Sequence, residues 1–170
     1  YLRFEQPRSM FAAMSFGNCG YAFPTIIGAK VAAPERPAVS YAGDGAWGMS
    51  FGEILTCVRE KIPVTAVVFN NEQWGAEKKN HVDFYENRFV GVNLDKQPSW
   101  AKVAQAMGAE GHTIDQLADV GPSDEGLLAG PGQDHHPHVI EAPDLQRRLP
   151  QLVHRLRIER VEHGRAVDGN

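Results

Sequence analysis

Short apolar runs alternate with amphipathic stretches between residues 11 and 117, a pattern typical of strands that are connected by helices. Residues 64–69 (VTAVVF) form an apolar run of strand length, as expected for a strand that is buried on both faces. Residues 38–42 (AVSYA) and 110–114 predict two further strands. We therefore predict an α/β fold of three layers, in which a parallel sheet carries helices on both faces.

Three segments have the spacing or the caps of helices. Residues 21–33 are rich in Ala, Ile and Gly, and Pro24 stands near the first turn, where its missing N–H is tolerated. Ser99 is an N-cap candidate for a helix over residues 99–107. After Ser50, another N-cap candidate, four apolar residues define one helical face that we expect to pack on the sheet: Phe51, Ile54, Leu55 and Val58.

The composition changes after residue 121. Residues 122–170 contain no Lys, Phe, Trp or Tyr but hold five of the seven histidines, so this stretch has little core material. Only residues 138–142 (HVIEA) resemble a strand, and residues 145–161 predict a helix with a basic face. We predict a domain over residues 1–121, truncated on its N-terminal side because the chain begins without a methionine, and a divergent tail over residues 122–170.

Composition and charge exclude several classes of function. The formal net charge of -4 and the pI near 6.0 offer no basic surface for a nucleic acid, and no apolar stretch is long enough to span a bilayer. The two cysteines, Cys19 and Cys57, form no CxxC pair, and no signal-peptide pattern is present. We expect a cytoplasmic protein with neither nucleic-acid nor membrane partners.

Polar residues follow two of the predicted strands. Asp44 lies in Gly43-Asp44-Gly45 after the first strand, and Asn71 follows the second, so parallel pairing would bring the two side chains together at the edge where ligands bind. A carboxylate, a carboxamide oxygen and a nearby main-chain carbonyl suit Mg²⁺, which implies a phosphorylated ligand. The two glycines would let a diphosphate approach the backbone, and the helix near Ser50 would direct its positive end toward it.

Each half of this pattern has a simpler interpretation, since Gly, Asp and Asn are the commonest turn formers. Together the halves match the Gly-Asp-Gly and Asn-Asn signature of thiamine diphosphate-dependent enzymes, with a strand, a helix and a strand in the expected order. Four longer segments are similar to the sulfoacetaldehyde acetyltransferases within that family, over about residues 1–121: MSFGNCGYAFPTIIGAK, SYAGDGAWGMS, IPVTAVVFNNEQWGAEKKNHVDFY and AQAMGAEG.

The resemblance implies roles for individual residues. The metal would be bound by two side chains and one main-chain oxygen, those of Asp44, Asn71 and Gln73 respectively. Thiamine diphosphate would be bound by Gly17, Asn18, Cys19, Gly43, Asp44, Gly45, Ala46, Trp47, Asn71, Gln73 and Trp74. Cys19 stands where related enzymes carry a bulky aliphatic residue, and an ordinary buried thiol is the alternative.

Lysines follow the predicted metal loop. Lys78 and Lys79 lie on a short helical stretch at the expected active-site entrance, where they could attract a small anionic substrate. The alternative is a solvated charged face. His135, His136 and His138 are close in sequence, but Pro137 lies between them and no acidic or thiol partner stands at helical spacing, so we do not expect a metal site there.

The resemblance also implies a reaction and its partners. Sulfoacetaldehyde and phosphate would give sulfite and acetyl phosphate, with thiamine diphosphate and Mg²⁺ as cofactors. The catalytic glutamate would come from an N-terminal domain of a second subunit in a homodimer or homotetramer, so no catalytic residue is identified here. We expect the chain alone to be inactive, with an apolar face for the partner built from Met14, Phe16, Tyr21 and Phe23.

Two alternatives to this activity stay open: an acetolactate synthase or pyruvate oxidase-like enzyme, and a cofactor-binding fragment without turnover. The tail has two explanations as well. A shifted reading frame would turn the family's Gly-Lys-Thr-Thr-Ile segment into residues 133–136 (QDHH) and would leave the sequence after Pro122 poorly packed. A genuinely divergent C-terminus is the alternative.

Overall fold

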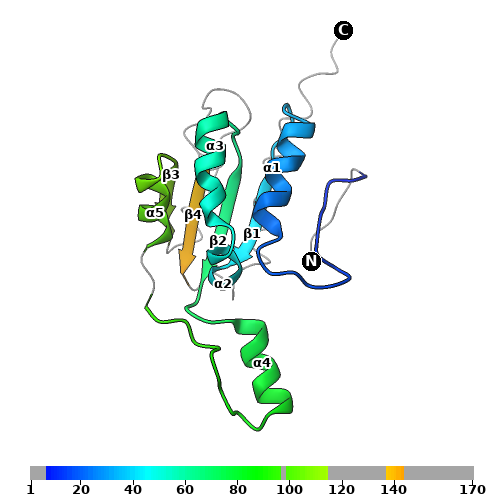
Figure 1. Ribbon diagram of the computed structural model, residues 1–170, viewed down its shortest axis with the longest axis vertical. Helices are drawn as coiled ribbons and strands as arrows, with labels where there is room; N and C mark the ends of the chain where they lie inside the picture. Colours follow the sequence, from blue (N-terminus) through cyan, green and yellow to red (C-terminus); the bar gives the residue numbers. More distant parts are fainter. Residues whose placement is uncertain (1–6, 97–98, 115–136, 144–170) are drawn as a thin grey trace.

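A parallel four-stranded sheet forms the centre of the protein in the computed structural model, which describes residues 7–96, 99–114 and 137–143 (Figure 1). The elements in chain order are α1 (Ala22–Ala32), β1 (Val39–Gly43), α2 (Asp44–Gly48), the 3₁₀ helix η1 (Phe51–Glu53), α3 (Ile54–Glu60), β2 (Thr65–Asn70), α4 (Gly75–Phe84), α5 (Trp100–Ala106), β3 (Glu110–Thr113) and β4 (His138–Pro143).

The strand order in the sheet is β1-β2-β4-β3, and every pairing is parallel. Gly43 stands opposite Phe69 in the β1–β2 pair, and Asn70 stands opposite Pro143 in the β2–β4 pair, so three strands end at the same edge. The predicted α/β class and the parallel sheet are confirmed. The chain returns from the edge strand β3 to insert β4 in the middle of the sheet.

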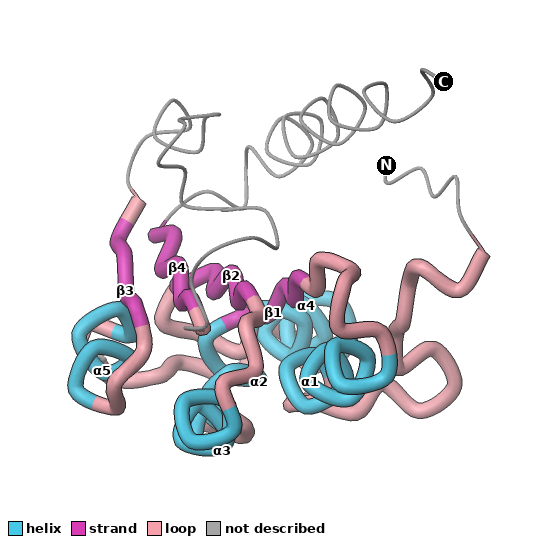
Figure 2. Tube along the Cα trace, turned by 90° about the horizontal axis from the view of Figure 1, so that it is seen from above, coloured by secondary structure: helices cyan, strands magenta, loops and turns pink. Residues whose placement is uncertain are grey.

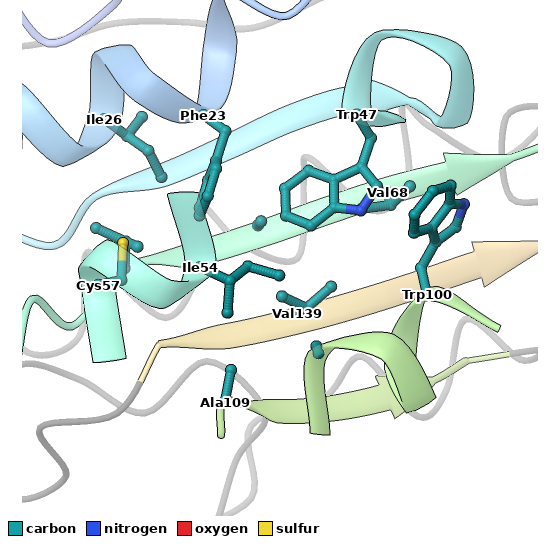
Figure 3. Close-up of a cluster of buried hydrophobic side chains, with 12 residues drawn as sticks. Phe23, Ile26, Trp47, Ile54, Cys57, Val68, Trp100, Ala109 and Val139 are labelled. Carbon is teal, nitrogen blue, oxygen red and sulfur yellow. The ribbon is translucent and has the colours of Figure 1, made fainter. Parts of the chain in front are cut away.

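Helices α1, α3 and α5 lie on one face of the sheet (Figure 2). The core between these layers contains Phe23, Trp47 and Val139, and the Trp47 ring meets Phe23 edge-on at 4.8 Å between centroids (Figure 3). The centre of the opposite face is shielded as well, because Val67 and Ile140, which alternate with core residues along β2 and β4, are buried. The two central strands are therefore shielded from solvent on both faces.

The helix predicted after Ser50 begins differently from the prediction. Ser50 makes no side-chain capping bond, and a 3₁₀ turn precedes α3. In that tighter turn residues i and i+3 lie on one side, so Phe51 is followed on the buried face by Ile54 and then by Cys57. Leu55 is 56% exposed, and its predicted place on the packed face is wrong. Ser99 does cap its helix, because its Oγ accepts from the Lys102 N–H at 3.4 Å.

Strand β4 lies beyond residue 121, in the segment predicted as a divergent tail. Its residues Val139 and Ile140 are buried, so the expected poor packing after Pro122 is wrong for the part that the structure describes. The helix predicted over residues 145–161 lies outside the described residues. The division at residue 121 and the shifted frame stay predictions.

Helix α4 extends beyond the carboxyl ends of the strands (Figure 1). None of its ten residues, all of which the structure describes, is buried. Phe84 and Val82 of this helix are largely exposed, as are Met14 and Phe16 near the N-terminus. Phe23, which was predicted to share the exposed apolar face, is instead in the core. Within the described residues, no helix combines the length and the apolar character that crossing a membrane requires.

Candidate cofactor-binding site

Asp44 is the centre of the candidate site. It directly follows β1 and begins α2, and only 1% of its surface is exposed. Its Oδ2 accepts the backbone N–H of Glu72 at 2.8 Å, and the backbone N–H groups of Gly45 and Asn71 also bond the carboxylate. The β1–β2 pairing thus brings Asp44 to the loop that contains Asn71, as the sequence predicts. That the three predicted oxygen ligands share one ion stays a prediction.

Burial raises the pKa of the Asp44 carboxyl, and the hydrogen bonds from Glu72, Gly45 and Asn71 oppose that rise. A buried carboxylate is costly unless its charge is compensated. A divalent cation would add such compensation. The donor chemistry of Asp44 therefore fits a hard cation such as Mg²⁺.

The loop after β2 is held by a second chain segment. Glu72 has a left-handed backbone (φ 55°), and its carbonyl accepts Leu94 N–H at 2.9 Å, while Trp74 N–H donates to Val92 at 2.8 Å. These two bonds form an isolated antiparallel bridge between Gln73 and Asn93. In such a bridge the central residue directs its own carbonyl away from the partner segment. This orientation fits the predicted use of the Gln73 main-chain oxygen.

The side chain of Gln73 has a different partner. Its Oε1 accepts from Lys78 Nζ at 2.8 Å, and the same ammonium donates to Asn93 Oδ1 at 2.9 Å and lies 5.6 Å from the centre of the Phe89 ring. Lys78 therefore links the loop after β2 to the segment that contains Asn93. Lys79 pairs with Asp83 one turn along α4, on the exposed surface, which agrees with the simpler interpretation of a solvated face.

Two glycines of the signature have different surroundings. A Cβ on Gly45 would meet ring atoms of Trp74 at 2.9 Å, so the indole packs directly on the backbone there. A Cβ on Gly43 would meet no described atom within 4 Å, which leaves the room that a diphosphate requires. The Trp47 side chain belongs to the core, so only its main chain could flank a cofactor.

The helix that begins at this edge is α2 and not the predicted one near Ser50. Gly43 is its N-cap, and Asp44 is its first residue. The prediction failed because residues 44–48 (DGAWG) include two glycines and show no helical period. The positive N-terminal end of α2 therefore lies within the Gly-Asp-Gly signature, closer to it than the helix predicted after Ser50 would be.

The segment of Gly17, Asn18 and Cys19 is exposed, and Cys19 is a free thiol. The alternative of a buried thiol is therefore wrong for this structure. Gly20, which follows the segment, lies close to the end of α2, because a Cβ there would meet the side chain of Met49 at 3.0 Å and the Ala46 carbonyl oxygen at 3.6 Å. A contact of Cys19 with a cofactor stays a prediction.

Sequence reasoning missed Glu141. This residue of β4 is 4% exposed, and its carboxylate accepts from Asn70 Nδ2 at 2.7 Å and from Ser99 Oγ at 2.8 Å. Longer contacts join it to Thr113 Oγ1 and to the N–H of Ala101, both at 3.4 Å. Glu141 thus connects the end of β2, beside Asn71, to β3 and to the start of α5. An acidic residue inside an apolar strand was the available signal, because a buried charge needs partners.

Comparison with known proteins identifies the family. The profile described as "Thiamine pyrophosphate enzyme, C-terminal TPP binding domain" matches residues 1–142. The chain belongs to this family. The match includes β4 as far as Ala142, and it makes thiamine diphosphate the cofactor of this fold.

Individual relatives carry more detailed names. The chain is 67% identical over 141 residues to the sulfoacetaldehyde acetyltransferase of Castellaniella defragrans, and 68% identical over 123 residues to that of Alcaligenes xylosoxydans xylosoxydans. These alignments cover 83% and 72% of this chain but only 23% and 20% of the relatives. The acetolactate synthase of Mycobacterium bovis is 32% identical over 124 residues, which are 71% of this chain and 20% of that protein.

Proposed function

We propose that this chain is the thiamine diphosphate- and Mg²⁺-binding part of an acetyltransferase that converts sulfoacetaldehyde and phosphate to acetyl phosphate and sulfite. The observation that carries the proposal is the identity of 67% with a sulfoacetaldehyde acetyltransferase, against 32% with an acetolactate synthase. An acetolactate synthase or pyruvate oxidase-like activity is the less supported alternative. A cytoplasmic location remains a prediction.

In the proposed site, Mg²⁺ is held by the Asp44 carboxylate, the Asn71 carboxamide oxygen and the main-chain oxygen of Gln73. The buried Asp44 favours the cation, and the cation offsets the charge of the diphosphate. The open space at Gly43 admits the diphosphate, and Trp74 packs on Gly45 to shape the adjacent wall. When bound, thiamine diphosphate supplies a nucleophilic carbon and an electron sink.

The remaining groups of the proposed active site come from elsewhere. We assign no catalytic base to the described residues, and we expect a glutamate from an N-terminal domain of a second subunit in a homodimer or homotetramer. Met14 and Phe16, which are 84% and 90% exposed and come just before Gly17, support such a contact. Lys78 supplies a positive charge beside the loop for a small anionic substrate.

The cofactor part of the proposal is tested by calorimetry. Thiamine diphosphate should bind to the chain only with Mg²⁺, and Asp44→Asn should weaken Mg²⁺-dependent binding at least tenfold because the buried anionic ligand is lost. Glu60→Gln, an exposed carboxylate at the end of α3, is the matched control and should bind as the parent does. Equal binding by Asp44→Asn would remove Asp44 from the site.

The substrate is tested in a chimera in which this chain replaces the matching C-terminal part of the Castellaniella defragrans relative. We expect sulfite release from sulfoacetaldehyde that depends on phosphate. Acetolactate formation from pyruvate, without sulfite release, would overturn the proposed substrate and favour the alternative. Asp44→Asn in the same chimera distinguishes loss of the cofactor from a wrong substrate.

A further inference from the structure

Three potential metal ligands lie together on strands β3 and β4. Glu110 and His112 are on β3, and His138 is the first residue of β4. One ligand atom from each residue lies within 4.8 Å of the other two. We refer to these three residues as the His–Glu cluster.

The strands place these side chains on the same face of the sheet. Glu110 stands opposite His138 in the parallel register, and His112 follows Glu110 at i+2. Gly111, between them, faces α5, because a Cβ there would lie 2.0 Å from the Ala101 carbonyl oxygen. Glu110 and His112 therefore face away from α5, and the hydrogen-bonded strands hold the cluster in place.

Two distances in the cluster are close to those between neighbouring metal ligands. Glu110 Oε2 lies 3.2 Å from His138 Nδ1 and 3.7 Å from His112 Nε2. Neighbouring ligands of a tetrahedral Zn²⁺ ion with bonds of about 2.0–2.2 Å are roughly 3.3–3.6 Å apart. Two imidazoles and one carboxylate are also a common ligand set for zinc, and they leave a fourth position for water.

The cluster is separate from the cofactor site. It lies toward the amino ends of β3 and β4, whereas Asp44 and Asn71 follow the carboxyl ends of β1 and β2. The side chains of His112 and Glu110 are 39% and 44% exposed, and that of His138 is 12% exposed. An ion from solution can therefore reach the cluster while His138 anchors it in the sheet.

We propose that the His–Glu cluster binds one Zn²⁺ ion, or a similar divalent transition metal, and thereby joins the edge strand β3 to β4. The ion replaces the contacts between the imidazoles and the carboxylate with coordination bonds to all three side chains. This site does not depend on the proposed acetyltransferase activity.

The experiment titrates the full chain with Zn²⁺ by calorimetry and with Co²⁺ by visible absorption. We expect one Zn²⁺ per chain, a four- or five-coordinate Co²⁺ spectrum, and a higher unfolding temperature with Zn²⁺. His112→Ala and Glu110→Gln, at partly exposed positions of the edge strand, should each weaken Zn²⁺ binding at least tenfold while circular dichroism stays that of the parent.

Two controls test other histidines. His81→Ala, on α4, should leave Zn²⁺ binding unchanged. A variant that replaces every histidine outside the described residues should also retain it: His135, His136, His154 and His163. The proposal is overturned if binding is lost in that variant, or if His112→Ala and Glu110→Gln weaken it less than tenfold, because the cluster is then only an ion pair.

Discussion

At the scale of single residues, parallel pairing made one contact of the candidate site predictable. Asp44 and Asn71 follow adjacent strands, so the meeting of Asp44 with the loop of Asn71 follows from topology alone. The contact of Trp74 with Gly45 and the buried bonds of Glu141 depend on side-chain packing between distant segments. Local sequence patterns carry no information about that packing.

Adding a methyl group at Gly45 should destabilise the protein by about 1–3 kcal/mol, because the new Cβ would lie 2.9 Å from the Trp74 ring. This cost exceeds the gain of up to about 1 kcal/mol that alanine brings to a helix. Gly48→Ala, in the same helix α2 with no atom within 4 Å, is the matched control and should be neutral or stabilising. Denaturant unfolding of both variants checks the prediction, and equal stabilities would contradict it.

Asp44→Asn should stabilise the metal-free chain at neutral pH. Burial raises the folded-state pKa of Asp44 above its ordinary value of 3.8, so the folded state binds the proton more tightly than the unfolded state does. The ionised carboxylate therefore lowers the stability of the parent chain as the pH rises through and above 3.8. Below that pH the carboxyl is protonated in both the folded and the unfolded state, and this cost is absent. Unfolding temperatures from pH 3 to pH 7 test this sign, and a variant less stable than the parent at pH 7 would refute it.

At the scale of elements, strands were predicted better than helix starts. The apolar run of β2 is continuous, and burial on two faces makes such a run a strand. Helix α2 was missed because Asp44–Gly48 is short and has no apolar period, and the 3₁₀ turn before α3 changed which side chains face the core. The position of β4 inside the sheet could not be predicted, because strand order depends on long-range pairing.

Glu141 connects four elements, so its loss should be costly. Glu141→Ala should destabilise the protein by about 2–4 kcal/mol, since it leaves the partly buried donors of Asn70 and Ser99 without their acceptor. Ser99→Ala should cost about 1 kcal/mol through loss of the cap. A double-mutant cycle measured by denaturant unfolding should give a coupling of at least about 0.5 kcal/mol. Additive effects would show that the two side chains act independently.

At the scale of the whole molecule, exposed and buried aromatic residues near the N-terminus have separate roles. Phe16 is 90% exposed, whereas Phe23 is 1% exposed in the core. The sequence alone could not separate them, because both are large apolar residues close to the start of α1.

Phe16→Ser should change the unfolding free energy of the chain by less than about 0.5 kcal/mol. Phe23→Ala should cost about 3–5 kcal/mol because it opens a cavity beside Trp47. In the chimera, Phe16→Ser should nevertheless reduce assembly, as measured by sedimentation, if this surface contacts a second subunit. Unaltered assembly would locate the subunit contact elsewhere.

The late position of β4 in the chain has a consequence for folding during synthesis. Residues 110–113 are made before residues 138–143, yet β3 pairs only with β4 among the described strands. Until β4 leaves the ribosome, both β2 and β3 present an edge with unpaired backbone groups, which is a template for association with other chains. Closure of the sheet therefore depends on the strand that is synthesised last among the four described strands, and nascent chains that stop before it are the ones most exposed to aggregation.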